Sequence, residues 1–136
     1  MERQRVRHWV QGRAMFEVKA IHEQRLLRIA MRGFWDASTM TAYSKAVRQE
    51  MAELQRTGGC QYVLINMIDF AIQSKEIADG HALNLRLVKE RGVARVALVM
   101  QSALSKLQAA RVVSDTGHLA FATEKDALDW LFEDHG

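Results

Sequence analysis

The sequence contains no proline, one cysteine, and no apolar run near the roughly 20 residues that a membrane-spanning helix needs. Without proline and with only 8 glycines, it has no Pro-rich linker or low-complexity tail. A single cysteine cannot form an internal disulfide, which fits a reducing compartment. The charged N-terminal stretch lacks the apolar core of a signal peptide. These absences predict a cytoplasmic protein with no integral membrane segment.

Positive charge is concentrated at the N-terminus of the 136-residue chain, whose net charge is +3. Residues 1–14 account for all of that charge through Arg3, Arg5, Arg7 and Arg13 against Glu2. Residues 15–136 are neutral overall, so no basic face is expected for nucleic acid. We therefore divide the chain into a basic leader, residues 1–14, and a single domain, residues 15–136. The leader is expected to be a solvated tail or an extra edge strand in which Val6, His8 and Val10 alternate, and contact with nucleic acid or an anionic surface is the alternative.

The first two strands of the domain are predicted by period-2 alternation. Phe16, Val18 and Ala20 alternate with charged residues, and residues 27–31 repeat the pattern. The segment 22–24 between them is short enough for a hairpin. Because half of their side chains are polar, these strands are expected to lie on the exposed side of the sheet.

A long helix is predicted between Asp36, a suitable N-cap, and residues 58–59, two glycines that permit the positive φ of a helix end. One helical face carries an apolar stripe: Met40, Tyr43, Val47, Met51 and Leu54. Four charged residues fall elsewhere and are expected to be solvated: Lys45, Arg48, Glu50 and Glu53. We interpret the stripe as a seam of the core rather than a cofactor site.

The central strand is predicted over residues 62–68, which are almost wholly apolar and rich in β-branched side chains. A short run of this kind is typical of a strand buried on both faces. After a polar loop, Ser74 is expected to cap a second helix that ends near Arg91. Its inward face is predicted to contain Ile77, Ala78, Ala82, Leu85 and Val88.

The rest of the chain continues the alternation of strands and helices. We predict a buried strand over residues 94–100, a helix from Ser102 through Arg111, a short strand over residues 118–121, and a last helix. The order is then β-β-α-β-α-β-α-β-α, in which buried strands alternating with helices argue for parallel crossovers. The predicted fold class is α/β, with a single mixed β-sheet and four helices packed on it.

The last helix is predicted to begin at Thr123, which forms a capping-box pattern with Asp126. Short helices are marginal in isolation, so this one needs apolar contacts to stay docked. We expect Trp130 to supply them by covering the sheet edge beside Phe121 and Leu131.

Four local signatures accompany this order: Gly-Phe-Trp-Asp at 33–36, Tyr-Val-Leu-Ile-Asn at 62–66, Arg-Val-Ala-Leu-Val at 95–99, and the closing helix at 121–131. Together they resemble the STAS superfamily, the fold of bacterial anti-sigma-factor antagonists, and its SpoIIAA-like group in particular. The likeness covers residues 15–132. It implies a non-catalytic regulatory module that binds a protein partner. The same fold is compared with lipid-binding CRAL-TRIO domains, which implies a small apolar ligand or lipid as the alternative.

The loop after the central strand departs from the motif of the antagonists, which is Asp-Ser-(Ser/Thr)-Gly with a Ser that a partner kinase phosphorylates. Here residues 72–77 read Ile-Gln-Ser-Lys-Glu-Ile, so Ser74 stands near the acceptor position without the Asp and the Gly. Helix N–H groups favour a phosphate there, whereas Glu76 and Asp79 would repel it. We interpret Ser74 as a plain N-cap, keep phosphorylation as the alternative, and expect no standard phospho-switch.

The same loop and the start of the second helix form the predicted recognition site. Open α/β sheets place their sites at the carboxyl ends of buried strands. The candidate residues are Asp69, Gln73, Ser74, Lys75, Glu76 and Asp79. Their acidic members suit a basic partner better than a phosphate.

No residue set in the sequence defines a reaction, so we expect no catalytic residue, metal or cofactor. The five histidines lack the spacing of a metal site, and the single cysteine has no partner. His81 is interpreted as a half-buried histidine and Cys60 as a small core side chain. The enzyme hypothesis is acid–base catalysis by Asp69, Glu76 and Asp79. We rank it below the simpler interpretation that these carboxylates are solvated surface residues.

The function hypotheses are then an interaction module, which we favour, a carrier of an apolar ligand, and last an enzyme. The carrier hypothesis is favoured by flexible methionine side chains, which can adapt to an apolar ligand: Met31, Met40, Met51, Met67 and Met100. An apolar cavity would favour the carrier, and a filled core with an exposed apolar patch would favour the interaction module. The oligomeric state is left open, a homodimer included.

Overall fold

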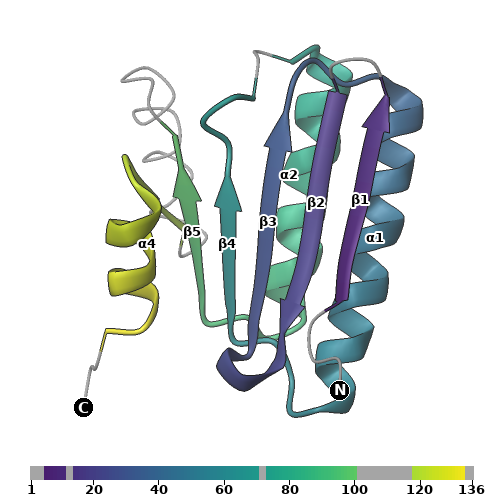
Figure 1. Cartoon of the computed structure of the whole chain (residues 1–136). Helices are drawn as coiled ribbons and strands as arrows, with labels where there is room; N and C mark the ends of the chain where they lie inside the picture. Colours follow the sequence, from purple (N-terminus) through teal and green to yellow (C-terminus); the bar gives the residue numbers. More distant parts are fainter. Residues whose placement is uncertain (1–4, 12–13, 71–72, 101–117, 134–136) are drawn as a thin grey trace.

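The structure is a computed structural model that describes residues 5–11, 14–70, 73–100 and 118–133 (Figure 1). Six strands form one sheet: β1 (Arg5–Gln11), β2 (Ala14–Ile21), β3 (Leu26–Arg32), β4 (Tyr62–Asn66), β5 (Arg95–Val99) and β6 (His118–Phe121). The helices of the described part are α1 (Ala37–Arg56), α2 (Lys75–Glu90), α4 (Glu124–Leu131) and the 3₁₀ turn His22–Gln24. The helix predicted from Ser102 through Arg111 lies outside the described residues.

The sheet is mixed, as predicted, and its strands lie side by side in chain order. The three N-terminal strands pair antiparallel, whereas β3 to β6 pair in parallel. β4 lies between β3 and β5, and its residues Val63, Leu64 and Ile65 are all buried. Val63 and Ile65 pack on one face of the sheet and Leu64 on the other. Burial of the central strand on both faces is confirmed.

The first strand lies within the segment that the charge pattern set apart as a leader. Residues 5–11 pair antiparallel with β2 and form one edge of the sheet. This is the edge strand that the alternation of Val6, His8 and Val10 allowed, and it raises the number of strands from the five expected to six. The boundary expected between residues 14 and 15 therefore falls at the start of β2.

Two hydrophobic clusters lie on opposite faces of the sheet. The larger one packs α1 and α2 against one face, and Figure 1 shows both helices behind the strands. The smaller one packs Ala127 and Leu131 of α4 against Leu64 and other residues of β3 to β5 on the opposite face. Since β4 and β5 contribute to both clusters, they form the shared centre of the molecule. No helix in the described part is long and apolar enough to cross a membrane.

Helix α1 confirms its predicted cap and stripe but not the solvation of Glu50. Asp36 accepts hydrogen bonds from the backbone N–H (2.9 Å) and hydroxyl (2.8 Å) of Thr39. Glu50 is 0% exposed, which corrects the expectation that it would be solvated. It lies four residues from both Ala46 and Leu54, so the helical period places it on their buried face.

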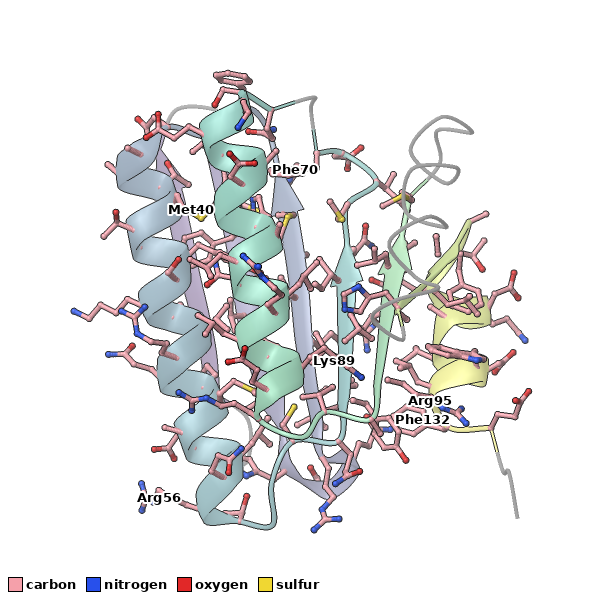
Figure 2. The ribbon with its side chains drawn as sticks, turned by 180° about the vertical axis from the view of Figure 1, so that it is seen from behind. Met40, Arg56, Phe70, Lys89, Arg95 and Phe132 are labelled. Atoms are coloured by element: carbon pink, nitrogen blue, oxygen red, sulfur yellow. The ribbon has the colours of Figure 1, made fainter. Side chains whose placement is uncertain are left out.

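Helix α2 buries only part of the face that was predicted to point inward. Ile77 and Val88 are buried as expected, but Ala78 and Ala82 are exposed. The face is turned toward α1, where the amide of Asn84 donates to the hydroxyl of Ser44 at 3.0 Å. Gly80 allows the close approach, because a Cβ there would lie 3.0 Å from Cε of Met40, which lies between the two helices (Figure 2).

Helix α4 is docked by aromatic and cationic contacts at the other end of the sheet. The ring of Trp130 lies 5.6 Å from that of Phe121, and Leu131 is buried. The guanidinium of Arg95 stacks over the indole at 5.1 Å and donates to the carbonyl oxygen of Trp130 at 2.5 Å. Figure 2 shows Arg95 and Phe132 together beside this helix. Trp130 is half-buried, so it covers the edge beside Phe121 only in part.

Candidate functional site

The candidate site lies where β3 and β4 end and where α1 and α2 begin. The chain leaves β3 through Gly33 and Phe34 and leaves β4 through Asp69 and Phe70. The two exits are joined, because the backbone N–H of Gly33 donates to the carbonyl oxygen of Asp69 at 3.2 Å, and Gly33 forms a parallel bridge with Phe70. The sheet therefore extends into the loops and gives them a rigid base.

Gln73 fastens these two loops together with both ends of its side-chain amide. Its oxygen accepts from the backbone N–H of Trp35 at 2.8 Å, and its nitrogen donates to the carbonyl oxygen of Gly33 at 2.9 Å. Gln73 was predicted as a recognition residue, and both ends of its amide are bonded to the backbone of the turn before α1. It holds the turn before α1 against the start of α2.

The start of α2 presents the remaining predicted residues to solvent. Ser74 is exposed and accepts at its hydroxyl from the backbone N–H of Ile77 at 3.4 Å, so it is the predicted N-cap. Lys75 and Asp79 form an exposed ion pair at 2.9 Å, and this hydrogen bond raises the pKa of Lys75. Glu76 is exposed, as is Asp69 in the preceding loop. The acidic residues thus surround the helix start without forming a buried cluster.

Phe34 is the surface residue that the sequence reasoning missed. Its side chain is 60% exposed, the largest exposure among the large apolar residues of the described part. It lies between Gly33, which adopts a positive φ of 82°, and Trp35, which is 1% exposed. The available signal was the 33–36 signature itself, in which two adjacent aromatic residues follow the end of β3 at Arg32. We call the set Phe34, Asp69, Ser74, Lys75, Glu76 and Asp79 the recognition surface.

An aromatic cluster supports the recognition surface from beneath. The imidazole of His81 lies 4.9 Å from Trp35, 5.3 Å from Tyr43 and 5.2 Å from Phe70, measured between ring centroids. Figure 2 shows Phe70 near the end of α2 at which the recognition surface lies. Nε2 of His81 is buried and has no hydrogen-bond partner among the described residues.

The cluster changes the chemistry of its ionisable members. Burial lowers the pKa of His81 to about 4, so the ring is neutral near pH 7. Burial also raises the pKa of the Tyr43 hydroxyl. Neither group is poised to exchange protons near neutral pH, which disfavours acid–base catalysis here.

The Cys60 thiol and the Glu124 carboxylate are two further groups that could serve in catalysis, and the structure shifts the pKa of both. Burial raises the pKa of the Cys60 thiol to about 11, so it is not a ready nucleophile. Burial would raise the pKa of Glu124, but hydrogen bonds from Asn66 and Arg28 and the charge of Arg28 lower it overall. Within the described residues, no three His, Cys, Asp or Glu side chains are arranged to hold a metal ion.

No family model and no curated protein matches this sequence. Among solved structures, the chain is similar to the crystal structure of an uncharacterized protein from the DUF3478 family with a SpoIIAA-like fold, from Shewanella loihica PV-4. The two are 17% identical, with a TM-score of 0.62 over 94% of this chain and 93% of that one. The fold is therefore SpoIIAA-like, which confirms the resemblance and the fold class drawn from the sequence.

Proposed function

We propose that this chain with a SpoIIAA-like fold is a non-catalytic regulatory module that binds a protein partner through the recognition surface. The carrying observation is Phe34, a large apolar side chain that is 60% exposed on a turn fixed at both ends by Gln73. An ordered, exposed aromatic residue loses little conformational entropy on binding and is the kind of anchor that dominates interfaces.

The charges beside Phe34 indicate the chemistry of the partner. Asp69, whose backbone bonds to Gly33, and Glu76 are exposed in the recognition surface, and Lys75 is paired with Asp79 there. A partner with an apolar pocket for Phe34 and a basic rim fits this arrangement. Since the Ser74 hydroxyl caps α2 and acidic residues surround it, we propose that binding does not depend on phosphorylation of Ser74.

The apolar-ligand alternative has no specific observation in its favour. Met31, Met51 and Met100 are buried in the larger cluster, and Met40 and Met67 pack against it. All five thioethers that suggested a carrier therefore contribute to core packing.

The test is affinity capture from a lysate of the protein's own host, followed by calorimetry with the purified partner. Phe34→Ser should weaken binding at least about tenfold, because it removes the anchor. The double variant Asp69→Lys, Glu76→Lys should weaken it further at low salt.

The matched control is Leu83→Ser, which removes another exposed apolar side chain, 49% exposed, from α2. The combined replacement of Arg3, Arg5 and Arg7 by Ala tests the N-terminal basic segment. Binding that survives Phe34→Ser and the charge reversal but is lost with either control would place the site elsewhere and overturn the proposal.

A further inference from the structure

The face of the sheet opposite α1 and α2 carries a second polar site. No described helix lies over the front of β2 and β3 in Figure 1, because α4 packs beside β5 at the other end of the sheet. A hollow of about 280 Å³ opens there, lined by Glu17, Lys19, Arg28, Ile29, Ala30 and Glu124. We call it the front hollow. It does not include any residue of the recognition surface.

Two cations face each other across the floor of the front hollow. Lys19 on β2 is directly opposite Arg28 on β3 in the antiparallel register, and both side chains are half-buried. Like charges directly opposite each other destabilise a strand pair. Lys19 makes no hydrogen bond or ion pair with any described residue, whereas Arg28 is paired with Glu124. Lys19 therefore lies beside a second cation without an ion pair to any described residue.

Carboxylates occupy the other sides of the front hollow. Glu17 lies two residues before Lys19 on the same face of β2, opposite Ala30. Glu124 in the first turn of α4 is fixed by Arg28 and by the amide of Asn66, which donates to its second oxygen at 2.8 Å. A carboxylate accepts about four hydrogen bonds, so these groups can receive further donors. The described lining has two positive and two negative side chains and no net charge.

We propose that the front hollow binds a small zwitterion of amino-acid size. Its carboxylate lies between Lys19 and Arg28 and relieves their repulsion, and its ammonium lies toward Glu17 and Glu124. The volume is near the lower limit of ligand sites, about 300–1,000 Å³, which restricts the ligand to one small molecule. A simple anion would meet repulsion from the two carboxylates, and a simple cation would meet it from Lys19 and Arg28.

The test is a titration of the ¹⁵N-labelled protein, followed by its backbone amide signals, with each of the twenty standard amino acids. At least one should shift the amides of Glu17, Lys19 and Arg28 saturably, with a Kd below about 10 mM. For the amino acid that binds most tightly, the analogue without its α-ammonium and the analogue without its carboxylate should each shift these amides less; for alanine these analogues are propionate and ethylamine.

Lys19→Gln should raise the Kd at least about tenfold, since it removes the cation that the carboxylate balances. The control is Lys45→Gln, which makes the same charge change at an exposed position of α1 on the far side of the sheet. The proposal is overturned if no amino acid shifts these amides, if either analogue shifts them as much as the amino acid that binds most tightly, or if Lys19→Gln binds that amino acid as tightly as the natural chain does.

Discussion

The imidazole of His81 is neutral in the fold because three aromatic rings surround it at 4.9–5.3 Å and burial lowers its pKa to about 4. In the unfolded chain the same group titrates near its ordinary value of 6.5. Between pH 6.5 and 4 the unfolded state therefore binds more protons, so stability is fully present above pH 6.5 and falls as the pH falls.

Replacing His81 by Phe, which keeps a ring in the cluster, should remove this part of the pH dependence. The natural chain should lose up to about 3 kcal/mol between pH 7 and pH 4 from this group, and His81→Phe should be spared that loss. Urea midpoints at both pH values measure it. Burial and the charge of Lys89 also lower the pKa of His118, which adds to the pH dependence of both chains. The prediction therefore concerns the difference between the pH dependence of the natural chain and that of His81→Phe. Equal pH slopes for both chains would contradict the prediction.

Gln73 gives a second prediction at the residue scale. Gln73→Ala leaves the N–H of Trp35 and the carbonyl of Gly33 without the side-chain partners they have now. Loss of such partners costs about 1–3 kcal/mol, and the turn before α1 should exchange its amide hydrogens faster. Gln55→Ala, at an exposed position of α1, is the matched control. Unchanged exchange at Trp35 would show that the turn does not depend on Gln73.

At the scale of the element, α4 depends on a short apolar face because it has only 8 residues. Leu131 is 1% exposed and Trp130 is half-buried, so Leu131→Ala should cost about 2–4 kcal/mol and Trp130→Ala about 2 kcal/mol. The full value of 3–5 kcal/mol for a buried indole does not apply, because part of the ring stays in water. Urea midpoints measure both, with the exposed Lys125→Ala as the control that should stay unchanged. A larger effect for Trp130→Ala than for Leu131→Ala would contradict this account of docking.

The whole molecule is expected to unfold in one step, because β4 and β5 supply residues to the clusters on both faces. Trp35 reports on the larger cluster and Trp130 on the smaller one. Two variants, each with the other tryptophans replaced by Phe, should show urea transitions in which fluorescence and circular dichroism coincide. A fluorescence change of Trp130 that precedes the loss of secondary structure would show that α4 detaches first.

Local pattern predicted much of the architecture. Alternation at 16–20 and 27–31, the apolar run from Tyr62 and the caps Asp36, Ser74 and Thr123 each act through neighbouring residues, so the sequence displays them directly. Their order then predicted the mixed sheet, since buried strands separated by helices pair in parallel.

Tertiary structure decided which face each element buries and what each site residue does. Glu50 is buried and Ala82 is exposed, although the apolar pattern of their helices predicted the reverse for both. The side-chain amide of Gln73 bonds to partners 38 and 40 residues away. Arg28 meets Glu124 in the front hollow, and Gly33 meets Asp69 beside the exposed Phe34, because folding brings distant segments together. The sequence by itself determined the elements and their order, and three-dimensional packing determined the surfaces.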